Sequence, residues 1–246
     1  PPTKLVGQII CAAILVFFGI RFHLLVFEPV NILLTFFWLI GITNAFNLLD
    51  NMDGLAAGVG VIVSLFLIFS MTGSSEWYVV VLLLSLAGAL LGFLFYNFHP
   101  ASVFMGDAGS LFVGFLLASV PLVVERGSSN IVSALFVPVF IFMIPILDTA
   151  LVTLSRKIAG RAISSGGKDH TSHRLVTLGL TEKKAVGVLY FLSVLAGGVA
   201  LLVDYFDLSL GLPVMFLTLL SISLLGVYLS RVRILKDEMP SSGLWP

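Results

Sequence analysis

Residues 31–71, NILLTFFWLIGITNAFNLLDNMDGLAAGVGVIVSLFLIFSM, contain two apolar runs separated by a short polar gap that holds Asp50 and Asp53. Each run is close to the roughly 17–25 residues with which an α-helix crosses the ~30 Å hydrocarbon layer of a membrane. A backbone in lipid must satisfy its own hydrogen bonds, and the alternating pattern of a membrane β-barrel is absent, so the runs predict helices. Acidic residues are costly beside such runs, which makes a function the first explanation to test for them.

The composition of the whole chain points to the same class. Of its 246 residues, 59% are hydrophobic and 11% are charged, and the mean hydropathy is +1.12, whereas a soluble domain needs far more charge. We therefore predict an all-α fold, a polytopic integral membrane helical bundle with about eight transmembrane helices. The predicted spans are residues 5–20, 31–47, 55–71, 78–95, 109–124, 131–153, 185–203 and 210–229.

The distribution of basic residues orients this bundle. With eight crossings, all thirteen Lys and Arg residues except Arg21 and Arg126 fall on one side, and such an excess marks the cytoplasmic side. The prediction is a single transmembrane domain over residues 1–230, with a cytoplasmic loop at 155–184 and a cytoplasmic tail at 231–246. The polar clusters described below then all face the cytoplasm.

The first polar cluster has a regular spacing. Its members recur every three residues and would line one side of a helix, where they converge on one ligand; they are Asn44, Asn47, Asp50 and Asp53. The alternative is a hydrogen-bonded seam between helices, formed by the two Asn residues, with both acids as helix caps. Two carboxylates with two carboxamides exceed what capping needs, which favours a ligand site.

The second cluster is YNFHPASVFMGDAGSLFVGF at residues 96–115, in which Asp107 lies between two glycines just before an apolar helix. Such a frame brings backbone N–H groups and a positive helix end toward an anion. The alternative is that Asp107 only caps the helix at 109–124, with Asn97 and Pro100 in an ordinary turn. With Asp50 and Asp53 on the same side, three carboxylates and no cysteine suit a hard cation such as Mg²⁺.

The third cluster lies in the basic loop at 155–184. His170 and His173 are spaced to share a helix face, and Arg174 follows them. These side chains supply hydrogen-bond donors to pyrophosphate oxygens. Zinc ranks below phosphate, because no third zinc ligand is near in sequence.

A further acid, Asp148, lies inside an apolar run after Pro138 and Pro145. It either lines the cavity or pairs with a loop Arg or with a backbone N–H freed at a Pro kink. His23 and His99 are interpreted as interfacial residues without a chemical role.

Three stretches resemble a known family. Asn44–Gly58, Tyr96–Leu111 and Asp169–Arg174 (DHTSHR) are similar to motifs of the polyprenyl-phosphate N-acetylhexosamine-1-phosphate transferases, in particular the bacterial undecaprenyl-phosphate N-acetylglucosamine-1-phosphate transferase branch. The resemblance implies Mg²⁺-dependent transfer of a sugar-1-phosphate from a UDP-sugar to a polyprenyl phosphate lipid, with release of UMP. Mn²⁺ is the expected substitute for Mg²⁺. It further implies an integral protein of the bacterial inner membrane.

The resemblance also implies roles for single residues. Asp107 would be the main Mg²⁺ ligand, and Asp50 and Asp53 would hold the metal region and the uridine diphosphate. Phe104 would stack on the uracil. The remaining substrate-binding residues would be Asn44, Asn47, Asn97, His170, His173 and Arg174.

Two departures from the family pattern matter. A third histidine that the family commonly has between the other two is Ser172 here, so a hydroxyl replaces a phosphate donor. The family also carries an adjacent Asp-Asp pair just before a segment like PPTKLVGQ, residues 1–8. We therefore expect this chain to be N-terminally truncated relative to the family, which leaves its activity in isolation open.

Two other functions compete with this interpretation. A phospho-N-acetylmuramoyl-pentapeptide transferase would differ in the donor sugar alone. A transporter with a cytoplasm-facing acidic site predicts acids near the bilayer midplane and matched repeats, and the sequence shows neither. A nucleic-acid partner is not expected, and a homodimer is left open.

Overall fold

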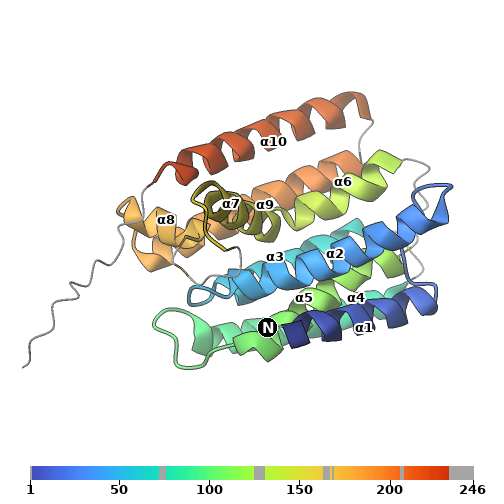
Figure 1. Cartoon of the computed structure of the whole chain (residues 1–246), viewed down its shortest axis with the longest axis horizontal. Helices are drawn as coiled ribbons and strands as arrows, with labels where there is room; N and C mark the ends of the chain where they lie inside the picture. The colour runs from blue at the N-terminus through green and yellow to red at the C-terminus, as the bar shows by residue number, and fades with distance from the viewer. Residues whose placement is uncertain are drawn as a thin grey trace, which may run out of the picture.

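A computed structural model describes residues 2–71, 76–124, 131–162, 167, 169–205 and 208–232. Every regular element in these ranges is a helix, as the apolar runs predicted (Figure 1). The helices are α1 (Pro2–Phe17), α2 (Glu28–Leu49), α3 (Leu55–Ser70), α4 (Trp77–Asn97), α5 (Gly106–Val123), α6 (Ile131–Ile141), α7 (Met143–Ile158), α8 (Thr171–Thr177), α9 (Glu182–Tyr205) and α10 (Leu208–Ser230). Arg126 and most of the predicted tail, residues 233–246, lie outside the described residues.

The number of membrane-crossing helices differs from the predicted eight. Within the described ranges, α2, α4, α5, α9 and α10 are long and apolar enough to cross a membrane, and α6 with α7 makes a sixth if the pair is one bent span. Helices α1 and α3 are apolar but shorter. The chain is therefore a polytopic helical membrane protein, and its described residues hold five or six helices of spanning length.

The sixth predicted span is not one straight helix. It divides at Phe142 into α6 and α7, which are bent by 76° relative to each other. Pro138 and Pro145 flank this break, and proline lacks the N–H of a continuous helix and clashes with the preceding turn. The Phe142 ring is fully buried and meets Trp38 and Phe46 of α2, with ring centroids 5.4 and 6.1 Å away. The break is thus packed into the core.

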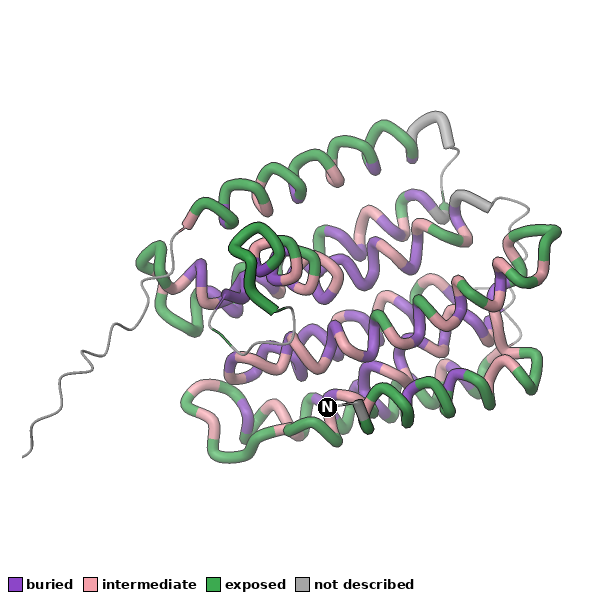
Figure 2. The backbone as a smooth tube through the Cα atoms, in the orientation of Figure 1, coloured by how far each residue is buried: buried purple, intermediate pink, exposed green. Residues whose placement is uncertain are grey.

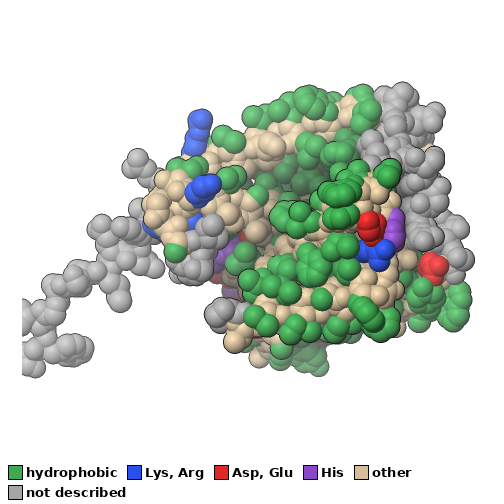
Figure 3. Space-filling view, turned by 45° about the vertical axis from the view of Figure 1, so that its right-hand side comes forward, with side chains coloured by type: hydrophobic (Ala, Val, Ile, Leu, Met, Phe, Trp, Pro, Cys, Tyr) green, Lys and Arg blue, Asp and Glu red, His purple; other side chains and the backbone are tan. Residues whose placement is uncertain are grey.

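Helices α2 and α3 form the middle of the bundle. Helix α2 packs against α1, α5 and α7, while α3 packs against α4 and α9, and α9 in turn contacts α6 and α10. Buried positions face this interior and exposed positions face outward on the peripheral helices (Figure 2). Large exposed side chains on those outer faces include Phe17 of α1 and Phe95 of α4. Figure 3 shows a flank covered by hydrophobic side chains, which is the surface expected of a bundle in lipid.

One end of the bundle collects the polar motifs. Helices α2, α4 and α7 end there, α3, α5 and α9 begin there, and α8 lies beside them, at the left in Figure 1. Hydrogen bonds confirm this proximity, because Asn51 accepts from Ser172 at 2.6 Å and Asn97 accepts from the Gly54 backbone at 3.1 Å. Motifs that are up to 121 positions apart in sequence thus meet at one membrane face.

Helices α2 and α5 approach each other most tightly beside Gly114. A Cβ atom built on Gly114 would lie 2.8 Å from Phe46 Cβ and 3.0 Å from the backbone Cα of Thr43. Small residues permit such close packing between membrane helices. A side chain at this position would push the two backbones apart, because a backbone atom cannot rotate away.

We predict that Gly114→Val lowers the thermal stability of the purified protein in detergent, by an overpacking cost on the order of 1–3 kcal/mol. The control is Gly88→Val on α4, where an added Cβ meets no atom within 4 Å. Thermal unfolding curves of the two variants provide the comparison. An equal loss of stability in both would show that the contact between α2 and α5 is not tight.

Candidate functional site

The turn between α2 and α3 is fixed by two other helices. Gly54 has a φ of 78°, a left-handed conformation that favours glycine. Its N–H donates to Asn97 Oδ1 at the end of α4, and its carbonyl accepts the Tyr190 hydroxyl of α9 at 2.5 Å. Asp50 and Asp53 lie in this turn just before Gly54. Their backbone positions are therefore set by α4 and α9 as well as by α2.

Asp107 lies in the first turn of α5, directly after Gly106, which has a φ of 65°. Asn47 of α2 donates its amide to Asp107 Oδ1 and lies within hydrogen-bond distance of Ser110 Oγ, each at 2.9 Å. Lys4 of α1 forms an ion pair with the other Asp107 oxygen. The Asp107 side chain is still 60% exposed, so the carboxylate is held by its neighbours and remains open to a ligand.

Asp50 lies close enough to Asp107 for the two charges to interact. Burial raises the pKa of Asp50, the Gly106 N–H that donates to its carboxylate acts in the opposite direction, and the charge of Asp107 raises the pKa further. Two neighbouring carboxylates repel each other unless a positive charge lies nearby. The Lys4 ammonium supplies part of that charge in this structure.

The residues around Asp107 fit a hard divalent cation. The available ligands are carboxylate oxygens of Asp107 and Asp50, with the Asn47 amide beside them. Oxygen ligands of this kind suit Mg²⁺, which commonly binds one or two carboxylates and completes its shell with waters and substrate phosphates. The donor set can hold such a cation, and the Mg²⁺ site itself stays a prediction.

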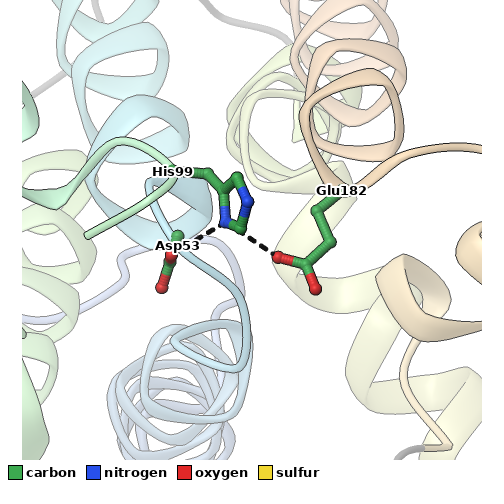
Figure 4. Close-up of side chains that lie close together, drawn as sticks. All are labelled: Asp53, His99 and Glu182. Carbon is green, nitrogen blue, oxygen red and sulfur yellow. Dashed lines mark hydrogen bonds and ion pairs between the residues drawn. The ribbon is translucent and has the colours of Figure 1, made fainter.

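A second cluster joins Asp53 to His99 and Glu182 (Figure 4). His99 Nδ1 lies 3.1 Å from Asp53 Oδ2 and 3.0 Å from Glu182 Oε2, and the Ala101 N–H donates to the same Asp53 oxygen. The three ligand atoms lie within 4.8 Å of one another, a spacing that would admit a metal ion. Existing contacts already use each of these atoms. The cluster thus ties the α2–α3 turn and the α4–α5 loop to the start of α9.

The basic helix α8 is anchored by a buried ion pair. Arg156 at the end of α7 donates to both carboxylate oxygens of Asp169, at 2.7 and 3.3 Å, and this pairing holds the pKa of Asp169 below its usual range. Arg174 is also buried, and it donates to the Asp169 carbonyl and to the Leu229 carbonyl at the end of α10, both at 2.9 Å. The Arg174 guanidinium therefore joins α8 to α10.

His170 is the residue just before α8, and its ring contacts a buried carboxylate of α7. Its Nδ1 lies 2.8 Å from Asp148 Oδ2, and the Thr171 N–H donates to Asp148 Oδ1 at 2.6 Å. Of the two alternatives for Asp148, the structure shows the paired one, with a histidine and a helix-start N–H in place of a loop arginine or a Pro kink. The His173 ring is 6.3 Å from that of His170.

Three of the predicted binding residues form hydrogen bonds within the protein, and a fourth, Phe104, is exposed to solvent. Asn44 exchanges hydrogen bonds with Gln8 of α1, at 2.8 and 3.2 Å, and the Asn97 amide donates to the Val103 carbonyl at 2.9 Å. Arg174 is engaged as described above, whereas Phe104 is 73% exposed on the α4–α5 loop. Their contacts with a substrate stay predictions.

Sequence reasoning missed Lys4, His99 and Glu182, and it offered Asp148 a loop Arg or a backbone N–H at a Pro kink but not His170. Lys4 reads as an ordinary flanking cation, and Glu182 reads as an acid in the first turn of a helix. His99 lies within the YNFHP segment of the second cluster, and this position beside Pro100 was the one signal for it. The remaining partnerships join residues more than 20 positions apart, which local patterns do not reveal.

An apolar helical bundle that gathers acids, amides and a basic helix at one end is an integral membrane protein with a polar site at the membrane face. A family model described as glycosyl transferase family 4 matches residues 1–125, just over half of the chain. The chain belongs to this family, as the three motifs predicted.

Curated relatives extend the similarity beyond the family match. A probable undecaprenyl-phosphate N-acetylglucosaminyl 1-phosphate transferase of Bacillus subtilis is 37% identical over 196 residues, covering 78% of this chain and 54% of the relative. A decaprenyl-phosphate N-acetylglucosaminephosphotransferase of Mycolicibacterium smegmatis is 37% identical over 228 residues, covering 80% and 56%. A phospho-N-acetylmuramoyl-pentapeptide-transferase of Lactobacillus johnsonii is 33% identical over 211 residues, covering 81% and 64%. The chain thus spans between half and two thirds of the length of these relatives.

We predict that Asp169→Asn loosens α8, because it leaves the buried Arg156 without its carboxylate; breaking such a pair costs on the order of 3 kcal/mol. The pKa of Asp169 is lowered in the fold, so its stabilisation is complete above the unfolded value of about 4 and is lost as the pH falls through the lower folded value.

Amide hydrogen exchange in α8 and thermal unfolding, measured at pH 7 and at decreasing pH below about 4, provide the test. The gap between wild type and variant should close as the pH falls. Lys183→Gln, at an exposed basic position on α9, is the control. If both variants exchange α8 amides at the same rate, the ion pair does not anchor this helix.

Proposed function

We propose that this protein transfers an N-acetylhexosamine-1-phosphate, in the first place N-acetylglucosamine-1-phosphate, from a UDP-sugar to a membrane polyprenyl phosphate and releases UMP. The observation that carries the proposal is the position of Asp107, which Asn47 and Lys4 hold beside Asp50 at the polar end of a membrane bundle. Membership of glycosyl transferase family 4 and the names of the relatives support it.

The reaction requires neutralisation of charge more than covalent work by the protein. An oxygen of the lipid phosphate forms a bond to the phosphorus that carries the sugar, and the bond from that phosphorus to UMP breaks. Both partners are anionic, so positive charge must offset their repulsion and the charge that develops in the transition state. A Mg²⁺ ion, when bound by Asp107 and Asp50, supplies this charge as a Lewis acid.

The chain's own residues would position the substrates around this point. Lys4 brings a second positive charge next to Asp107, and Asn47 fixes the direction of the Asp107 carboxylate. The exposed Phe104 ring is available to stack on the uracil. His170, just before α8, and His173 on α8 would contact the pyrophosphate. Helix α8 is tied to the α2–α3 turn through Ser172 and Asn51.

The location of the site suits a lipid acceptor. The polar end lies where the apolar flank of the bundle stops, so a phosphate on an isoprenoid chain can reach it while the chain stays in lipid. The excess of basic residues at this end favours the cytoplasmic face of a bacterial plasma membrane, where UDP-sugars would be available.

The proposed donor is a UDP-N-acetylhexosamine. The relatives named for N-acetylglucosamine phosphate transfer are each 37% identical to this chain, and the pentapeptide transferase is 33% identical. This difference favours N-acetylglucosamine as the first donor to test.

The deciding experiment measures Mg²⁺-dependent release of UMP from UDP-N-acetylglucosamine in the presence of polyprenyl phosphate. It uses the full-length gene product and, beside it, the chain of residues 1–246. We expect release that requires both the metal and the lipid. Failure with this donor and with other UDP-N-acetylhexosamines would contradict the proposal and would direct attention to transport.

We predict that Asp107→Asn in the full-length protein lowers the rate by orders of magnitude while the protein keeps its fold. The amide cannot hold the cation as the carboxylate does. UMP release and thermal unfolding, measured side by side, separate the two effects. Turnover near the wild-type rate would exclude a metal-binding role for Asp107.

We also predict that His173→Ala raises the KM for the UDP-sugar more than the KM for the lipid, because the ring lies on the helix proposed to contact the pyrophosphate. His23→Ala is the matched control, since His23 is exposed in the α1–α2 loop at the opposite end of the bundle. An equal loss for both substrates would show that α8 acts only as a structural element.

A further inference from the structure

Asp148 is the most deeply buried acid near the site, and the proposed reaction gives it no task. Its exposed fraction is 1%, and it lies on α7 below the start of α8. One carboxylate oxygen meets His170 Nδ1 at 2.8 Å, and the other accepts the Thr171 N–H at 2.6 Å. A single carboxylate therefore fixes both the histidine ring and the backbone at which α8 begins.

The two Asp148 oxygens contact the His170 ring and the Thr171 N–H, while two hydroxyls close in sequence stay without a partner. The hydroxyls of Thr149 and Thr171 are buried and have no hydrogen-bond partner within the described part of the chain, although they neighbour Asp148 and His170 in sequence. The Asp148 oxygens thus contact the ring nitrogen and the backbone N–H, and neither of these two hydroxyls. A buried carboxylate is costly unless it is paired, so this pairing explains how Asp148 is tolerated.

The pairing also decides which ring atom is left for a ligand. An ionised carboxylate only accepts hydrogen bonds, so the 2.8 Å contact with Asp148 Oδ2 calls for the proton on His170 Nδ1. The ring is 6% exposed, and the other nitrogen, Nε2, has no hydrogen-bond partner in the described residues and is not sealed from solvent. A carboxylate on one ring nitrogen commonly fixes the tautomer and orientation of histidine, so that the other nitrogen can act.

A separate hydrogen bond connects helix α8 to the α2–α3 turn that carries Asp50 and Asp53. Ser172 Oγ donates to Asn51 Oδ1 at 2.6 Å, and Asn51 follows Asp50 in the α2–α3 turn. His170 is two residues before Ser172. The open nitrogen of His170 is therefore carried on the segment that contacts the carboxylate end of the site.

We propose that Asp148 is a positioning residue that holds His170 by Nδ1 and leaves Nε2 to contact a phosphate group of the substrate. The inference rests on the proposed phosphate transfer. Its structural half, the fixed ring, is independent of that reaction and can be measured without it.

The first test is ¹⁵N NMR of the full-length protein with labelled histidine, in detergent at alkaline pH where the rings are neutral. This chain has four histidines, and His170→Gln identifies the signal. We expect His170 to carry its proton on Nδ1, and Asp148→Asn to shift that population toward Nε2. A wild-type ring protonated mainly on Nε2 would overturn the proposal, and this readout does not need activity.

The second test is kinetic. Asp148→Asn should lower kcat/KM for the UDP-sugar by about 10–100-fold, the usual effect of removing such a partner, with the lipid KM within about twofold of wild type. The control is Thr149→Val on the same helix, which removes an unpartnered buried hydroxyl and should leave both constants unchanged.

A double-mutant cycle shows whether Asp148 acts through His170. The combined Asp148→Asn and His170→Gln variant should be no slower than His170→Gln alone. Independent, additive losses would overturn the proposal, as would a wild-type rate in Asp148→Asn. If no variant or wild-type protein releases UMP, the proposed function fails, and the NMR result still decides whether Asp148 fixes the ring.

Discussion

Helices α2 and α5 can lie against each other because Gly114 has no side chain, and the rest of the site follows from that contact. Two turns from Gly114 along α5, Asn47 of α2 reaches Asp107 at 2.9 Å. A wider separation would leave this hydrogen bond unmade and would move Asp107 away from Asp50. The geometry of the polar end thus depends on packing deeper in the apolar bundle. Helices in lipid associate through close van der Waals packing, because the surrounding lipid is as apolar as the helix surfaces.

Hydrogen bonds then assemble the three motifs around this pair of helices. The α2–α3 turn is tied to α4 and α9 through Gly54, to α8 through Asn51, and to the α4–α5 loop through Asp53. Each tie uses a backbone group or a short polar side chain. Such contacts preserve the carboxylates' positions while the Asp107 side chain stays open, which is the arrangement expected of a preorganised site.

Much of this could be read from the sequence, and the reasons for the rest are physical. Apolar runs predicted the helices, because their length and lack of charge are local properties. About eight spans were predicted, whereas five or six of the described helices have spanning length, because α1 and α3 are shorter than a full span and the sixth breaks at Phe142 between two prolines. The three-residue spacing predicted that Asn44, Asn47, Asp50 and Asp53 converge on one ligand. The structure brings Asn47 and Asp50 together with Asp107, whereas Asp53 pairs with His99. The pairings of Asp148 with His170 and of Asn44 with Gln8 were not predictable, because they depend on how separate helices dock.

The 76° bend between α6 and α7 has a consequence for how a lipid-borne substrate would arrive. Helix α7 turns away from α6, and it carries the exposed apolar side chains Leu154 and Ile158 on either side of the buried Arg156. Hydrocarbon can therefore lie against α7 as far as the rim of the polar end. For a reaction of the proposed kind, the lipid acceptor would reach the site by two-dimensional diffusion within one leaflet. Its encounter rate would depend on the surface density of the lipid in the membrane, whereas the encounter rate of the nucleotide sugar would depend on its concentration in solution.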